Sequence, residues 1–187
     1  MKINQRKLTG VYEIISYPIN DERGSFSRLF DEQIANKAGL NTLWYQESIS
    51  HTIRKNTIRG LHASLPPSLE GKTITAIKGK IQWVVVDIRK KSSTFGEWDS
   101  IILSEQNHKT LYAEQGFAHG CLSLSDDCTL LLRADNYYSE VNGTGIFWGD
   151  EDIGVEWELD GPPIISDRDR QYGSFSKFKE ENGAVIL

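Results

Sequence analysis

Short apolar stretches rich in β-branched residues recur along the whole chain, and they predict strands rather than helices. The clearest two are 74–77 and 81–88, and the Lys78-Gly79-Lys80 turn between them predicts a β-hairpin. Short strands at the observed spacing indicate a β-sandwich or a β-barrel. Further strands are expected at 10–16, 25–30, 43–50, 56–62, 98–103, 109–112, 117–124 and 129–135.

Helical signals are few. Residues 31–38 predict a helix with Asp31 as its N-cap, and residues 172–179 predict a short helix near the C-terminus. The chain contains no internal repeat, low-complexity tract or interdomain linker. With 187 residues, of which 39% are hydrophobic, the chain is long enough to bury one core, so we expect residues 1–187 to form a single domain.

The charge balance narrows the class of partner. A formal net charge of −5 argues against a nucleic-acid-binding surface, which needs a basic face to displace counterions. A local basic pocket for a nucleotide sugar remains compatible with an acidic protein. The opening residues lack an apolar stretch of signal-peptide length, and no later segment could span a bilayer, so we expect a cytoplasmic protein without a membrane partner.

The two cysteines suggest no chemistry. Cys121 and Cys128 lack the spacing of a metal-binding finger. In a cytoplasmic chain they are expected to be free thiols rather than a disulfide.

Four short segments carry a base, cations and a carboxylate. They are Arg59-Gly60-Leu61-His62, Lys72, the GFAHG motif at 116–120 that contains His119, and Ser166-Asp167-Arg168-Asp169. A histidine beside a carboxylate can act as a general base near neutral pH. An arginine and a second histidine suit a phosphorylated ligand. Together these residues predict proton abstraction from an anionic substrate in a pocket inside a barrel.

These and other motifs make the chain resemble the dTDP-4-dehydrorhamnose 3,5-epimerases of the cupin superfamily and relatives that act on other nucleotide-linked 4-keto sugars. The resemblance covers most of the chain and depends on the number, order and spacing of the motifs. The matching segments are Asp21-Glu22-Arg23-Gly24-Ser25-Phe26, RGLH at 59–62, Pro66-Pro67, Lys72, Val86-Asp87-Ile88-Arg89, Ser93-Thr94-Phe95-Gly96, GFAHG at 116–120, Tyr137-Tyr138, Trp148, Ser166 and Asp169.

The resemblance implies a fold and an assembly. It implies an all-β cupin jelly-roll barrel with a few short helices, acting without a cofactor or metal. It also implies a homodimer in which the N-terminal strands of one subunit reach the partner's pocket. The implied ligand is a nucleotide diphosphate linked to a 4-keto-6-deoxy sugar, either a hexose or a heptose.

The implied reaction assigns roles to three residues. In a 4-keto sugar, the hydrogens on C3 and C5 flank the carbonyl, so a base can remove one and leave an enolate that is reprotonated from the other face. By resemblance His62 is the base, Asp169 orients its imidazole, and Lys72 stabilises the enolate.

The resemblance also implies a set of ligand contacts. Arg59 and His119 correspond to diphosphate contacts, Arg23 to another ligand contact, and Phe26 to a surface on which the nucleotide base stacks. For two of these a simpler interpretation stays open, because Arg23 beside Gly24 could be an ordinary turn cation and Phe26 an ordinary core aromatic.

Several positions depart from the family pattern. Leu132-Arg133 stands where the family carries a tyrosine–lysine pair whose tyrosine is catalytic, and leucine cannot donate a proton. Trp83 replaces an aspartate, and Ser64 replaces a glutamine, which changes the floor of the pocket. Arg28 replaces a glutamate and Ser48 an asparagine, so recognition of the nucleotide base should differ from that of the dTDP-specific enzymes.

The missing tyrosine leaves two interpretations open. The protein could epimerise one centre only, with Tyr138 or water returning the proton. It could instead be a ketoisomerase or a non-catalytic nucleotide-sugar-binding cupin. A metal-dependent cupin is the weakest alternative, because Ser64 occupies the place of a second histidine and only His62, Glu70 and His119 remain as ligands.

Overall fold

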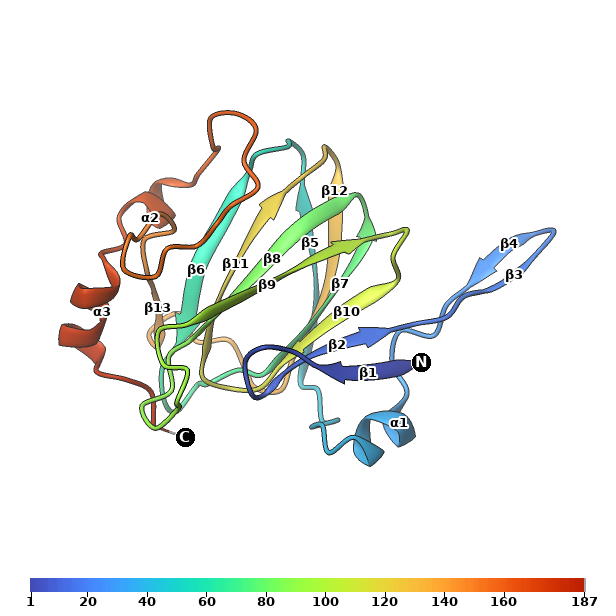
Figure 1. The fold of residues 1–187 in the computed structure, drawn as a ribbon, viewed down its shortest axis with the longest axis horizontal. Helices are drawn as coiled ribbons and strands as arrows, with labels where there is room; N and C mark the ends of the chain where they lie inside the picture. Colours follow the sequence, from blue (N-terminus) through green and yellow to red (C-terminus); the bar gives the residue numbers. More distant parts are fainter. Residues whose placement is uncertain (187) are drawn as a thin grey trace.

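The computed structural model describes residues 1–186 as two antiparallel sheets packed face to face (Figure 1). This is the all-β jelly roll that the sequence predicts. The six-stranded sheet has the order β1 (Lys2–Gln5), β2 (Val11–Ile15), β10 (Lys109–Ala113), β7 (Lys72–Lys78), β12 (Cys128–Ala134) and β5 (Gln46–Thr52). The five-stranded sheet has the order β13 (Gly143–Gly145), β6 (Ile58–Ser64), β11 (Phe117–Ser123), β8 (Lys80–Asp87) and β9 (Trp98–Ser104).

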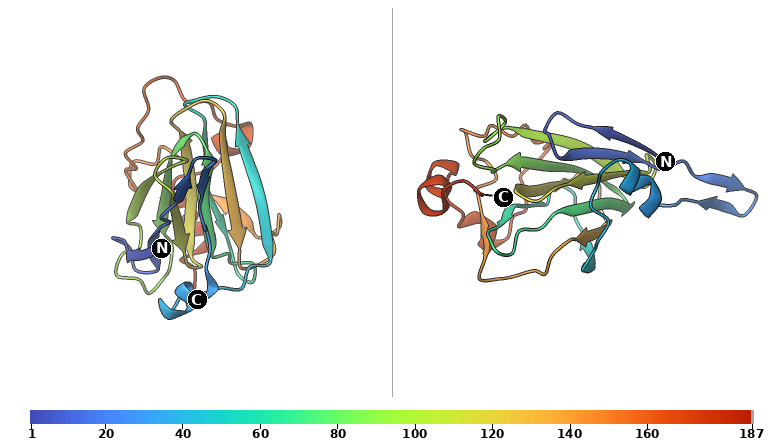
Figure 2. Two further views of the ribbon diagram at one scale, coloured as in Figure 1. Left: turned by 90° about the vertical axis from the view of Figure 1, so that its right-hand side faces the viewer. Right: turned by 90° about the horizontal axis from the view of Figure 1, so that it is seen from below.

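A third, two-stranded sheet stands apart from the barrel. Strands β3 (Ile19–Asp21) and β4 (Gly24–Phe26) pair with each other and project beyond the two large sheets, at the end of the molecule away from β6 (Figures 1 and 2). Helix α1 (Glu32–Lys37) follows the hairpin and is capped by the Asp31 side chain, which accepts a hydrogen bond from the Ile34 N–H, as predicted.

The alternation of side chains along each strand builds the inner core. Residues one apart point to opposite faces of a sheet, so Ile81, Trp83 and Val85 of β8 face inward while Val84 and Val86 face outward. The six-stranded sheet contributes the other half of this core. Its inward residues include Ile74, Ala76, Leu111, Ala113 and Leu130.

The outer face of the five-stranded sheet is covered by the C-terminal segment. Helices α2 (Asp167–Arg170) and α3 (Phe175–Asn182) lie on this side (Figure 1). Phe175 and Phe178 pack in one buried cluster with Leu61, Val84 and Val86. Burying an aromatic side chain in this way contributes about 1.5–3 kcal/mol. The two side chains together therefore hold α2 close to β6.

One expected element is wrong. Residues 78–80 do form a turn, with Gly79 at φ +78°, but β7 and β8 belong to different sheets and do not pair as a hairpin. Both strands turn apolar residues toward the same inner core, so the apolar pattern is equally satisfied when the turn carries the chain from one sheet to the other.

Several element boundaries differ from the predictions. The strand expected at 25–30 ends at Phe26, and the strand expected at 43–50 begins at Gln46. The helix expected at 172–179 begins later, because the Ser174 side chain caps it by accepting from the Lys177 N–H. Strands β1, β3 and β13 and helix α2 were not predicted, since each has only three or four residues.

Cys121 and Cys128 are both buried and unpaired, as expected. Burial raises the pKa of the Cys121 thiol to about 12, so it stays protonated at neutral pH. The helices of the described chain are all too short or too polar to cross a membrane.

Candidate active site

Three strands bring His62, His119 and Lys72 to the inner face of the barrel. His62 of β6 lies directly opposite His119 of β11, and residues opposite each other in an antiparallel pair share a face. On β7, Lys72 shares its face with Ile74 and Ala76, which belong to the inner core. Residues far apart in the sequence therefore meet at one end of the barrel.

A β-bulge places Arg59 on the same face as His62. The register between β6 and β11 shifts here, so that Arg59 pairs with Cys121 and His62 with His119. Gly60 lies inside the bulge at φ +113°, and a Cβ there would come within 2.5 Å of the His119 carbonyl oxygen. The RGLH motif thus needs glycine at its second position for a steric reason.

Asp169 holds both the bulge and the His62 ring. Its Oδ2 accepts from the Gly60 N–H at 2.9 Å, and its Oδ1 lies 2.8 Å from His62 Nε2. The Asp169 N–H in turn donates to Ser166 Oγ, the N-cap of α2. Burial alone would raise the pKa of Asp169, but the hydrogen bonds from His62 and Gly60 outweigh it and lower the pKa below its usual value.

The ionised Asp169 carboxylate fixes the tautomer of the neutral His62 ring. A carboxylate can only accept, so His62 Nε2 carries the hydrogen and Nδ1 keeps its lone pair. The His62 side chain is 42% exposed while that of Asp169 is 5% exposed. An imidazole held from behind by a buried carboxylate and open in front is the arrangement of a general base.

Lys72 is held by a buried carboxylate of its own. Glu70 Oε2 lies 3.2 Å from Lys72 Nζ and accepts a hydrogen bond of 2.7 Å from the Ser64 hydroxyl. Glu70 and Lys72 border a cavity of about 200 Å³ at the end of the six-stranded sheet. The cavity is also lined by Gln46, Ser48, Leu132 and Tyr138.

The second histidine is fully enclosed. His119 is 5% exposed, its Nδ1 lies 3.3 Å from Trp83 Nε1, and its Nε2 has no hydrogen-bond partner within the described chain. Burial lowers the pKa of His119 well below its usual value, and the charges of Lys72 and His62 lower it further. His119 is therefore neutral at physiological pH.

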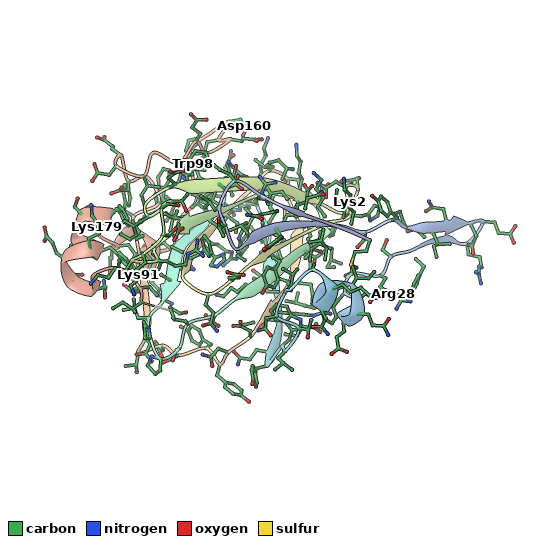
Figure 3. The ribbon with its side chains drawn as sticks, turned by 60° about the horizontal axis from the view of Figure 1, so that its bottom comes forward. Lys2, Arg28, Lys91, Trp98, Asp160 and Lys179 are labelled. Carbon is green, nitrogen blue, oxygen red and sulfur yellow. The ribbon has the colours of Figure 1, made fainter. Side chains whose placement is uncertain are left out.

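The remaining predicted ligand contacts fall into two groups. Arg59 lies beside His62 and donates to the Thr52 hydroxyl and the His51 carbonyl, both at 3.2 Å. Arg23 and Phe26 lie on the projecting hairpin, and Phe26 is 63% exposed rather than a core aromatic. Figure 3 labels Arg28 where the chain returns from this hairpin.

The hairpin residues do not meet His62 within one chain. Arg23 forms an ion pair with Asp21 of the same hairpin, and Arg28 lies 4.0 Å from Asp31. Because β3 and β4 project away from the barrel, this hairpin is separated from the barrel strands that carry His62 and Lys72 (Figures 1 and 2).

Leu132 and Tyr138 line the same cavity. Leu132 packs partly against the inner core, at the position where the family pattern has tyrosine. Tyr138 is 57% exposed, so it is a surface aromatic rather than a packing residue. Tyr138 and Tyr172 raise the pKa of Arg168, and Arg168 Nε donates a hydrogen bond of 2.9 Å to the Tyr172 hydroxyl.

Two neighbours of the proton-transfer residues were not predicted in these roles: Tyr172 was not named, and Glu70 was named only as a ligand in the metal-dependent alternative. The Tyr172 ring lies 5.9 Å from the His62 ring, centroid to centroid, over Gly145. Glu70 stands two residues before Lys72, and a spacing of two places both on one side of an extended segment, which was the available signal. Among residues 1–186, no three histidine, cysteine, aspartate or glutamate side chains are grouped to hold a metal ion.

The fold and this geometry define a class of protein. It is a jelly-roll protein whose barrel interior carries a carboxylate-held histidine and a lysine, which are groups able to move a proton and to stabilise the resulting anion.

Comparison with known proteins identifies the family. The model of the dTDP-4-dehydrorhamnose 3,5-epimerase family matches residues 5–177. The dTDP-4-dehydrorhamnose 3,5-epimerase of Shigella flexneri is 38% identical over 150 residues, which cover 80% of this chain and 82% of the relative. The enzyme of that name from Mycobacterium tuberculosis (strain CDC 1551 / Oshkosh) is 37% identical over 178 residues, which cover 94% and 88%.

Solved structures agree with this result. An epimerase of Mycobacterium tuberculosis superimposes with a TM-score of 0.93 at 34% identity, covering 100% of this chain and 94% of the other. The dTDP-6-deoxy-D-glucose-3,5-epimerase of Legionella pneumophila, solved with dTDP-4-keto-L-rhamnose, gives 0.93 at 26% identity, covering 100% and 98%. The chain belongs to the dTDP-4-dehydrorhamnose 3,5-epimerase family, and it is an isomerase of the nucleotide-sugar epimerase class.

Proposed function

We propose that this protein epimerises a nucleotide-diphosphate-linked 4-keto-6-deoxy sugar, a hexose or a heptose, at C3, C5 or both. The observation that carries the proposal is the His62–Asp169 contact of 2.8 Å, on the same inner face as Lys72. The solved Legionella relative with dTDP-4-keto-L-rhamnose bound supports a substrate of this chemical class.

In the proposed reaction, His62 Nδ1 takes a proton from the carbon next to the ketone. The electron pair of the broken C–H bond forms the enolate, and Lys72 Nζ donates a hydrogen bond to its oxygen. The imidazolium formed on His62 is stabilised by the Asp169 carboxylate. A proton delivered to the opposite face of the same carbon then restores the ketone with inverted configuration.

The proton donor is the step at which this chain differs from the family. Leu132 cannot supply a proton, and Tyr138 is the phenol that borders the cavity beside it. We therefore assign the return of the proton to Tyr138 or water, which favours inversion at one centre over inversion at both. A poorer donor leaves deprotonation intact while it limits which centre is reprotonated from the far face.

The diphosphate is assigned to Arg59 and His119. The bulge at Gly60 turns Arg59 to the face that carries His62, and His119 presents an unpartnered Nε2. A guanidinium and an imidazole N–H both suit phosphate oxygens. Arg28 is assigned to recognition of the nucleotide base.

We propose a homodimer that completes each site. Arg23 and Phe26 stand on a hairpin that leaves its own barrel, and Ile19 and Phe26 of this hairpin are 72% and 63% exposed. An extended apolar hairpin gains stability when a second subunit covers it. In the dimer, Arg23 and Phe26 of one subunit would contact the ligand held by the other.

Deuterium exchange tests the proposed function. The protein is incubated in deuterated water with dTDP-, CDP-, GDP- and UDP-linked 4-keto sugars, and the products are followed by NMR and mass spectrometry. Epimerisation predicts deuterium at C3 or C5 with inverted configuration at that carbon. A product in which the carbonyl has moved would establish a ketoisomerase instead, and binding without exchange would establish a nucleotide-sugar-binding cupin.

A further inference from the structure

A hydrogen bond between Trp83 and His119 determines where the His119 proton resides. Trp83 Nε1 and His119 Nδ1 are 3.3 Å apart, and both side chains are nearly fully buried, at 6% and 5% exposed. The indole nitrogen is a donor only, so His119 Nδ1 must accept and carries no hydrogen. The single proton of the neutral ring therefore lies on Nε2.

The other ring nitrogen has no partner within the described residues. His119 Nε2 is buried and makes no hydrogen bond to residues 1–186. A buried donor left unpaired costs about 1–3 kcal/mol, so a native protein usually satisfies such a group with a ligand or an ordered water. His119 lies opposite His62 and feels the charge of Lys72, so this donor belongs to the same pocket.

We propose that Trp83 is a positioning residue that fixes His119 as a neutral Nε2–H donor for an oxygen of the bound nucleotide sugar. The same contact prevents His119 from acting as a second base, because its Nδ1 lone pair is occupied and its Nε2 already carries a proton. Protonation of the ring on both nitrogens would break the bond to Trp83. The contact between His119 Nε2–H and the ligand rests on the proposed function, whereas the position of the proton on Nε2 does not.

Both facing histidines carry their proton on Nε2, but their partners leave opposite hydrogen-bonding groups free. His62 Nε2 donates to a carboxylate and leaves Nδ1 as a base, whereas His119 Nδ1 accepts from an indole and leaves Nε2 as a donor. An aspartate at position 83, as in the family pattern, would accept a hydrogen bond from Nδ1, so the His119 proton would move from Nε2 to Nδ1. Tryptophan at position 83 thus changes the hydrogen-bonding role of the neighbouring His119.

Nitrogen NMR on the ligand-free protein tests the position of the proton. In the 15N-histidine-labelled wild type, we expect His119 to have an unprotonated Nδ1 and a protonated Nε2 between pH 5.5 and 8, with the signal assigned by its loss in His119→Gln. Trp83→Phe removes the donor and keeps a ring, and we expect Nδ1 to become partly protonated. Trp83→Asp, the family residue, should move the proton fully to Nδ1.

Two NMR results would overturn the proposal. One is a wild-type His119 that carries its proton on Nδ1 or titrates like an ordinary histidine. The other is a folded Trp83→Phe or Trp83→Asp protein in which the His119 signals are unchanged. These spectra need no ligand, so they stand even if no 4-keto sugar is turned over.

Calorimetry with dTDP, CDP, GDP and UDP tests the role of the donor. The amide nitrogen of glutamine reaches the place of Nε2, whereas that of asparagine reaches only the place of Nδ1. We expect His119→Asn to bind about tenfold more weakly than His119→Gln, the effect of one hydrogen bond to a charged group. Equal affinities of the two variants would show that Nε2 donates to nothing on the nucleotide and would overturn the assigned contact.

Discussion

His62 and His119 face each other across adjacent strands, yet their ring nitrogens have partners of opposite hydrogen-bonding character. At the residue scale, therefore, the neighbour decides what an imidazole can do. Asp169, in helix α2, determines which nitrogen of His62 donates. This dependence gives two predictions about single side chains.

Asp169→Asn should lower the rate of exchange without weakening ligand binding much. The asparagine oxygen can still accept from the Gly60 N–H, but its NH₂ group must donate to His62 Nε2 and forces the proton to Nδ1, where the base is needed. We expect a loss on the order of 100- to 10,000-fold in kcat. Asp167→Asn, at a 95% exposed position of the same helix, is the matched control. A large rise in KM with unchanged kcat would assign Asp169 to binding instead.

Leu132→Tyr should raise the yield of the second inversion. The wild type is expected to exchange readily at one carbon and to invert only that centre, because no tyrosine stands at position 132. Leu132→Phe adds the ring without the hydroxyl and controls for crowding against the core near Trp83. NMR of the products separates the two centres. Efficient double inversion by the wild type would contradict this account and make Tyr138 the first residue to mutate.

The sequence was informative about residues whose identity carries chemistry. The motifs drew attention to His62, Lys72 and Asp169, and the structure brings His62 within 2.8 Å of Asp169 and holds Lys72 on the same face. The sequence contained no indication of the Trp83–His119 hydrogen bond, because this bond depends on a diagonal contact between two strands. Tyr172 was missed for a similar reason, since Gly145 lets its ring approach His62.

At the scale of elements, a β-bulge brings Arg59 and His62 to one face, and the proposed dimer would add a hairpin to the site. The apolar pattern predicted most strands, because burial on one face imposes a period of two. It could not tell that β7 and β8 join different sheets, since both placements bury the same side chains. Helix α2, with four residues, is too short for a periodic signal, and its position is set by Ser166 and Asp169.

The β3–β4 hairpin gives the prediction at this scale. His62→Asn lacks the base, and the double variant Arg23→Ala/Phe26→Ala lacks the hairpin contacts, so each alone should be nearly inactive. If each site combines residues of two subunits, mixing the two variants should recover about a quarter of wild-type activity, from the mixed dimers. Activity is measured after exchange of subunits is verified by mass spectrometry. No recovery in verified mixed dimers would exclude a shared site.

At the scale of the whole molecule, a buried ionic network ties the two ends of the chain to the barrel. Asp87, at the end of β8, is fully buried and accepts from Arg89 at 2.7 Å and from Thr94 at 2.7 Å. Arg89 also donates to the Thr9 carbonyl and pairs through a β-bridge with Val185. The network therefore contributes to stability rather than to chemistry.

Asp87→Asn should lower the free energy of unfolding at pH 7 by about 3–5 kcal/mol, the cost of breaking a buried ion pair. Burial alone would raise the pKa of Asp87, but hydrogen bonds from Arg89, Ser92 and Thr94 lower it below its usual value of 3.8. The stabilisation is therefore present above pH 3.8 and is lost as pH falls through the lower, folded-state pKa. Urea denaturation at pH 7 and pH 3 measures both effects. A variant as stable as wild type at pH 7 would contradict the assigned role.

The central claim is that His62 is the base of an epimerase. His62→Asn removes the proton acceptor, and His108→Asn is its matched control, because residue 108 lies in a turn at φ +50°, a conformation that asparagine tolerates. The measurement is the rate of deuterium incorporation next to the ketone of the best wild-type substrate. We predict a loss of about 100- to 10,000-fold for His62→Asn and a wild-type rate for His108→Asn. Near-normal exchange by a folded His62→Asn protein would contradict the account.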